Sequence, residues 1–116
     1  MLDSTYLIGE YTDGVLVASV KTEKVGEYEA QIIAAELKEA LSKGKPRLVL
    51  DMQAVLLLAS AGIGMLLDLF RHCQSGGGKF AMCAMDEDVL GSLRVTKMDR
   101  LFNIKKDRAS ALAVMV

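Results

Sequence analysis

Two short apolar runs, RLVLDM at residues 47–52 and FAMCAM at residues 80–85, constrain the fold of this chain most strongly. A strand that is apolar at successive positions has to be covered on both faces, and such strands are typical of parallel sheets flanked by helices. GIGMLLDLFRHCQ at residues 62–74 lies between the two runs, and we predict that it forms a helix. Strand, helix and strand in this order indicate a parallel β–α–β unit.

The neighbouring segments continue this alternation in both directions. Asp13-Gly14 separates two strand-like segments and favours a tight hairpin turn, because that turn needs residues that tolerate positive φ. The predicted elements are strands at 4–11, 14–20, 47–52, 80–85 and 101–105, and helices at 27–42, 62–74, 86–96 and 108–116. We expect the last helix to turn Ala109, Leu112, Ala113 and Val116 inward. The fold class is therefore predicted to be α/β, with a mixed, mostly parallel sheet of four or five strands and helices mainly on one side.

Composition narrows the class of protein. The length of 116 residues suits a single domain over residues 1–116, and a hydrophobic content of 52% argues against disorder. Lys and Arg number 14 against 15 Asp and Glu, so no basic surface for direct nucleic-acid binding is expected. No signal peptide precedes the first strand, and no apolar stretch reaches the roughly 20 residues of a membrane helix. We therefore expect a cytoplasmic protein without membrane association.

The residues that usually bind metals or carry out catalysis are few. Cys73 and Cys83 form neither a CxxC pair nor a zinc-like cluster, and we expect both thiols to be reduced and packed. The one histidine, His72, lies about three helical turns after Ser60, too far along the helix to pair with it. ASAGIG is not the G-x-S-x-G motif, and GGGK at 76–79 is not a phosphate-binding Walker loop. No enzymatic activity, metal site or cofactor is predicted.

The segment LLASAGIGMLL at residues 57–67 contains one serine, Ser60, which is the only hydroxyl-bearing residue between Gln53 and Arg71. It follows a strand and precedes a helix, at the edge where open α/β sheets bind ligands. The start of a helix favours negative charge, so a phosphate on Ser60 would lie in a favourable field. Ser60 also suits a structural role as a helix cap. The two roles are compatible.

Methionines are frequent, and their positions suggest two uses. Met65 and Met82 lie inside apolar runs and are predicted to fill the core, whereas Met98 lies in the polar stretch TKMDR and is predicted to be an exposed contact.

PRLVLDMQAVLLLASAGIGMLLDLFRHCQSGGGKFAMCAM at residues 46–85, followed by LFNIKKDRASALAV at residues 101–114, resembles the STAS domain of bacterial anti-sigma factor antagonists. The resemblance implies a small cytoplasmic regulator of transcription. Such a protein binds an anti-sigma factor that is also a serine kinase, and thereby frees the sigma factor. Phosphorylation of one serine blocks this binding, and a phosphatase restores it.

The resemblance assigns the phosphorylated position to Ser60 and the motif glycine to Gly62. The acidic residue that precedes the serine in the family is Ala59 here, and the hydroxyl residue that follows it is Ala61. A further family aspartate is replaced by Val25, although Glu23 is present nearby. The residues predicted to form the partner-binding surface are Glu23, Lys24, Ala59, Ser60, Ala61, Gly62, Ile63 and Met65.

Two other functions stay open. Ala59 and Ala61 make the turn more apolar, which favours an interaction or scaffold module that works without phosphorylation, including a homodimer. STAS-like folds also occur attached to anion transporters and in lipid-transport complexes, so the resemblance also admits a module that binds a small ligand.

Overall fold

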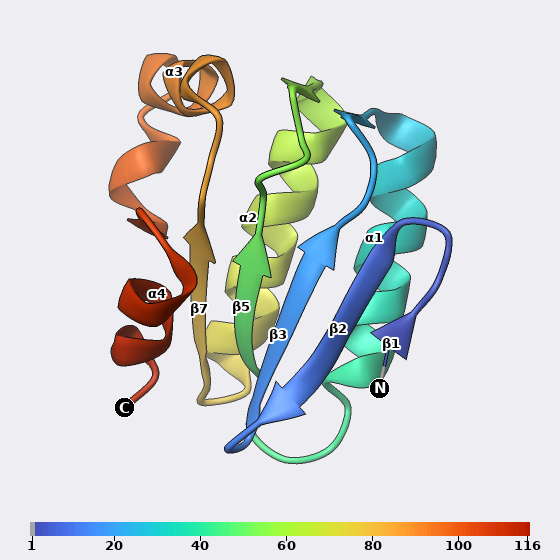
Figure 1. Cartoon of the computed structure of the whole chain (residues 1–116), viewed down its shortest axis with the longest axis vertical. Coiled ribbons are helices and arrows are strands. Elements are labelled where there is room, and N and C mark those ends of the chain that lie inside the picture. Colours follow the sequence, from blue (N-terminus) through green and yellow to red (C-terminus); the bar gives the residue numbers. More distant parts are fainter. Residues whose placement is uncertain (1) are drawn as a thin grey trace.

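The computed structural model describes residues 2–116, and a six-stranded sheet in the order β1-β2-β3-β5-β7-β8 forms its centre (Figure 1). The strands are β1 (Leu2–Asp3), β2 (Leu7–Thr12), β3 (Val15–Val20), β4 (Lys24–Val25), β5 (Arg47–Asp51), β6 (Leu57–Leu58), β7 (Lys79–Cys83) and β8 (Asn103–Lys105). The helices are α1 (Glu27–Ala40), α2 (Ser60–Ser75), α3 (Glu87–Val95) and α4 (Arg108–Val114), with a 3-10 turn at Met98–Arg100. Within these residues no helix combines the length and apolarity needed to cross a membrane.

The predicted α/β class is confirmed, with a mixed and mostly parallel sheet. Strands β1, β2 and β3 pair antiparallel, whereas β3, β5, β7 and β8 pair parallel. The sheet has six strands, not four or five, because β1 adds a strand at one edge. Two residues are too short for a period-2 pattern, so the sequence gives no signal for β1. Asp13 and Gly14 both have positive φ, as the predicted hairpin turn requires.

The sheet is covered on both faces, but unequally. Helices α1 and α2 lie together on one face, while the shorter α4 lies on the other (Figure 1). The main core lies between the sheet and the two long helices, and its largest buried side chains include Leu16, Leu48, Leu50, Met82, Ile33, Leu37, Leu66 and Leu69. A smaller cluster lies under α4 and contains Val15, Val17, Val49, Ala81, Cys83, Ala111 and Met115. Strand β5 contributes to both clusters, which explains its continuous apolar sequence.

Two predictions about individual side chains are wrong. Helix α4 buries Ala111 and Met115, whereas Ala109, Ala113 and Val116 are exposed. Arg108 contacts the sheet, and residues 108, 111 and 115 share one helix face, so this contact sets the rotation of the helix. Met98 is half-buried and packs against the main core, so it is not an exposed contact.

Cys73 and Cys83 are unpaired and fully buried, which confirms the prediction that both are reduced and packed. They lie in different clusters, Cys73 in the main core and Cys83 under α4. Burial raises the pKa of each thiol from 9.0 to about 11, and at Cys83 the nearby carboxylate of Asp51 adds to the effect of burial. Both thiols are therefore neutral and unreactive at neutral pH.

Alkaline pH is expected to weaken the fold through these two thiols. Between pH 9.0 and about 11 the folded state holds protons that the unfolded state has released, so the free energy of unfolding falls as the pH rises. Urea unfolding at pH about 8 and about 10.5 measures this loss. The Cys83→Ala variant should lose less stability over this interval than the wild type. Equal losses of unfolding free energy in both proteins would contradict the raised pKa of Cys83.

Candidate functional site

The connection between β5 and α2 crosses the carboxyl edge of the sheet before the helix begins. Met52 and Val55 are fully buried and anchor this connection. The amide of Met52 donates to the carbonyl of Cys83 at 3.0 Å, and the amide of Val55 donates to the carbonyl of Met52 at 3.0 Å. The chain is therefore held at its turn, and the residues that follow project beyond the sheet.

The next residues are fixed by a short parallel pairing between β4 and β6. The amides of Leu56 and Leu57 both donate to the carbonyl of Glu23, at 2.8 and 2.9 Å. The amide of Ala59 donates to the carbonyl of Val25 at 3.0 Å. The structure therefore brings residues 23–25 beside the Ser60 turn, where the sequence analysis placed Glu23 and Lys24.

Ser60 is exposed and is the first residue of α2, at the same end of the molecule as α3 (Figure 1). The sequence analysis expected the helix to begin near Gly62, with Ser60 as a cap. Instead, Ala59 occupies the cap position in an extended conformation and makes no side-chain hydrogen bond to the helix. The helix begins earlier because the bond from Ala59 to Val25 already ends the extended segment at residue 59. The serine hydroxyl therefore lies on the surface of the first turn.

The first turn of α2 lacks the capping oxygens that the other helices have. Asp86 and Asp107 accept amide hydrogen bonds at the starts of α3 and α4, and Glu29 accepts the amide of Gly26 before α1. The bond from Ser110 holds the pKa of Asp107 below its usual value. No acidic side chain lies in the first turn of α2. Its first amides have no acceptor within the helix and favour a negative charge.

The two glycines after Ser60 have different surroundings. A Cβ atom on Gly62 would lie 2.5 Å from Leu58 Cδ1 and 2.9 Å from the Val25 carbonyl oxygen, so Gly62 lets α2 pack closely against β4 and β6. Gly64 is exposed, and a Cβ atom there would meet no atom within 4 Å. Residues 60 and 64 share one helix face. The open glycine beside Ser60 is therefore Gly64.

Two residues of the predicted partner-binding surface are wrongly placed by the sequence analysis. Gly62 and Met65 are buried, because they face the sheet side of α2 and pack inside the molecule. Neither residue can therefore offer an exposed contact to a partner. Ala59, Ala61 and Ile63 are half-buried, and Glu23, Lys24 and Ser60 are exposed.

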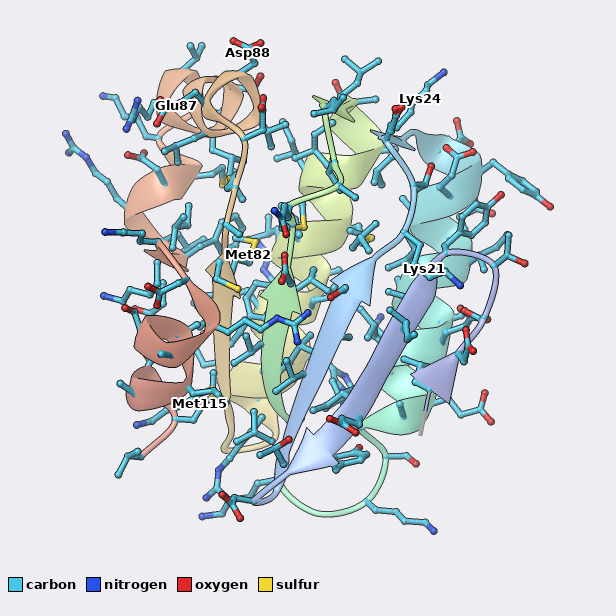
Figure 2. The ribbon with its side chains drawn as sticks, viewed as in Figure 1. Lys21, Lys24, Met82, Glu87, Asp88 and Met115 are labelled. Atoms are coloured by element: carbon cyan, nitrogen blue, oxygen red, sulfur yellow. The ribbon has the colours of Figure 1, made fainter. Side chains whose placement is uncertain are left out.

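Two exposed leucines could not be recognised as surface residues from the sequence. Leu56 and Leu57 are 54% and 57% exposed, although they lie in an apolar run that looks like core. Their exposure follows from the pairing of β6 with only one short strand. We call Leu56, Leu57, Ala59, Ser60, Ala61, Ile63 and Gly64 the Ser60 surface. Figure 2 shows Lys24 and the acidic pair Glu87 and Asp88 at this end of the molecule, on different elements.

An exposed serine at a helix start beyond the carboxyl edge of a mixed sheet agrees with the comparison to known families. A model described as the STAS domain matches residues 10–111. The chain belongs to the STAS family. This confirms the resemblance seen in the sequence.

Several proteins similar to this STAS protein are named as anti-sigma factor antagonists. BtrV of Bordetella bronchiseptica, a protein assigned as an anti-sigma factor antagonist, is 26% identical over 101 residues, which are 87% of this chain and 86% of BtrV. An anti-sigma factor antagonist from Thermotoga maritima superposes with a TM-score of 0.83 at 21% identity, covering 96% of this chain and 95% of that one. The antagonist SpoIIAA, solved in its unphosphorylated form, has a TM-score of 0.77 at 14% identity, with 91% and 92% covered. SpoIIAA from Bacillus has also been solved in its phosphorylated form, with a TM-score of 0.72 at 12% identity and 95% and 99% covered.

Alanine substitutions at the two glycines are expected to have opposite effects. Gly62→Ala should destabilise the protein by about 1–3 kcal/mol, because the new methyl group overlaps Leu58 and the Val25 carbonyl. Gly64→Ala should stabilise it by about 0.5–1 kcal/mol, since alanine favours a helix and the site is open. Urea unfolding of both variants measures the difference. A stabilising Gly62→Ala would show that α2 does not pack against β4 and β6 as described.

Proposed function

We propose that this STAS protein acts as a single domain that binds an anti-sigma factor with serine-kinase activity. In this proposal the partner docks on the Ser60 surface, phosphorylation of Ser60 blocks docking, and a phosphatase restores it. The observation that carries the proposal is the exposed Ser60 at the uncapped start of α2, three residues after the exposed Leu57. Its relatives support the same function, because they are anti-sigma factor antagonists.

The position of Ser60 favours a phosphate chemically. The hydroxyl is exposed, so it is accessible to the active site of a kinase. A phosphate adds about −1.5 to −2 charges at neutral pH, and the unpaired amides of the first helical turn can donate to its oxygens. Ala59 supplies no competing carboxylate, and Val25 is buried. The phosphorylated form is therefore compatible with the fold.

The neighbouring leucines explain how a phosphate would block docking. In the unmodified state Leu56 and Leu57 offer apolar area that a partner can cover. A phosphate on Ser60 would then have to lose water against an apolar surface, and an uncompensated buried charge is costly. In this proposal the switch acts mainly through desolvation.

The alternative without phosphorylation rests on Ala59 and Ala61. Both are partly buried and apolar, so the same surface could dock a scaffold partner or a second copy of the chain. Such docking would not respond to the state of Ser60. The small-ligand alternative gains nothing at the Ser60 surface from a groove of about 900 Å³, because that groove is lined by the end of α1, β1 and the residues before β5.

A phosphomimetic substitution separates these functions. Ser60→Asp should weaken binding to the kinase partner at least about tenfold, which corresponds to about 1.4 kcal/mol, whereas Ser60→Ala should bind like the wild type and accept no phosphate. Ser75→Asp is the matched control, since it changes an exposed serine at the other end of α2. Calorimetric titration measures the affinities, and mass spectrometry after incubation with ATP locates the phosphate. Equal affinities for wild type and Ser60→Asp would favour the unswitched module.

Gly64 offers a second test of the docking surface. Gly64→Ala places a methyl group on the helix face that carries Ser60, so it should weaken partner binding several-fold while it stabilises the fold. Gly91→Ala in α3 is the control, because its site is also open. Gly91→Ala should stabilise the fold and leave the affinity unchanged. If both variants bind alike, the partner does not approach this face of α2.

A further inference from the structure

Asp51 is the only charged or polar residue in residues 2–116 that is buried, with 7% of its surface exposed. It is the last residue of β5, and its two carboxylate oxygens accept hydrogen bonds from different elements. Oδ2 accepts a hydrogen bond from Arg108 Nε at 2.8 Å, and Oδ1 accepts one from the amide of Gln53 at 3.0 Å. One buried carboxylate therefore contacts both the first residue of α4 and the start of the connection to Ser60.

Arg108 reaches a second strand from the same position. Its Nη2 donates to Ser19 Oγ at 2.5 Å, so the guanidinium group spans the ends of β3 and β5. This arrangement uses the planar, multiple-donor geometry of arginine, which the single ammonium group of lysine cannot reproduce. Arg108 therefore fixes where α4 sits and how it is rotated.

The stability of α4 depends on its contacts with the sheet. It has seven residues, and a helix of this length is not stable by itself. Its buried contact with the sheet comes from Ala111 and Met115. At its other end, Lys79 Nζ donates to the carbonyls of Val114 and Val116 at 3.1 and 3.3 Å. Polar contacts of Arg108 at one end of α4 and of Lys79 at the other thus hold a small apolar contact in place.

We propose that the Asp51–Arg108 pair couples α4 to the Ser60 surface, so that docking of α4 and the arrangement of residues 53–59 stabilise each other. Arg108 and Asp51 are positioning residues in this account. Without Arg108 the Asp51 carboxylate is left buried without its cation, a costly state that is relieved when the carboxylate turns toward water. That movement removes the acceptor of the Gln53 amide and loosens the segment that carries Leu56 and Leu57.

The two cysteines provide a built-in measurement of this coupling. Cys83 lies under α4, whereas Cys73 lies in the main core on the other face of the sheet. Both are fully buried. Release of α4 exposes Cys83 alone, while global unfolding exposes both thiols, so the ratio of their labelling rates reports on α4.

The experiment compares Arg108→Met with Lys38→Met. Lys38 pairs with Asp68 between α1 and α2 at 2.6 Å, and this pair is exposed on helices that lie on the face of the sheet opposite α4 (Figure 1). Mass spectrometry measures N-ethylmaleimide labelling of each cysteine and hydrogen exchange of the amides at 53–59. Arg108→Met should raise labelling of Cys83 relative to Cys73 about tenfold or more, and should speed exchange at 53–59 several-fold. Lys38→Met should change neither, and Arg108→Lys should give an intermediate result.

Several results would overturn the coupling. Faster labelling of Cys83 with unchanged exchange at 53–59 would show that α4 moves independently of the Ser60 surface. Unchanged labelling in Arg108→Met would show that the pair does not hold α4. If Arg108→Met unfolds globally, both cysteines are labelled and Arg108→Lys becomes the deciding variant. In Arg108→Lys, labelling of Cys83 and exchange at residues 53–59 must rise more than labelling of Cys73.

The consequence for partner binding rests on the proposed function. Coupling between two sites is reciprocal, so a partner that binds more tightly when α4 is docked should slow labelling of Cys83 relative to Cys73 in the wild type, and Arg108→Met, which favours the released state, should weaken partner binding. A bound partner that leaves the ratio of Cys83 to Cys73 labelling unchanged would overturn the coupling of α4 to docking. The labelling and exchange measurements need no partner, and the Ser60→Asp test needs no change at Arg108. Failure of either proposal is therefore recognised separately.

Discussion

The burial of β5 on both faces is the constraint on which the rest of the structure depends. Leu48 and Leu50 face the two long helices, and Val49 and Asp51 face α4. A strand covered on both sides is typical of parallel sheets, whose neighbouring strands are joined by connections that cross the sheet. Those connections leave from the carboxyl edge, and for this reason the segment that carries Ser60 projects there. The position of the candidate site follows from the core.

Much of this arrangement could be predicted from the sequence because the signals are local. The apolar runs of β5 and β7, the Asp13-Gly14 turn and the place of Ser60 between a strand and a helix all depend on residues close together in the chain. The pairing of β4 with β6 could not be predicted, because it joins residues about 30 positions apart through two-residue strands. The exposure of Leu56 and Leu57 depends on that pairing, so their sequence indicates core.

The errors at Gly62, Met65 and α4 have a related physical origin. A glycine in a helix shows that a side chain is absent, but only the packing of α2 shows that Gly62 faces Leu58 and that Gly64 faces solvent. The rotation of α4 was predicted from the number of apolar side chains on each face. In a helix of seven residues, a contact between Arg108 and the sheet outweighs that count. Short elements take their orientation from single contacts with distant residues.

The alanines at positions 59 and 61 change the physical character of the proposed switch. A carboxylate beside a phosphorylated serine adds repulsion that acts at a distance and weakens as salt is added. Here the nearest neighbours are apolar, and the loss of water from a phosphate against Leu56 and Leu57 acts only on contact. Such a switch acts mainly on the close packing that follows the approach of a partner. Its strength therefore depends on how rigidly residues 53–59 hold the two leucines beside Ser60, and so on the contacts made by Asp51 at the start of that segment.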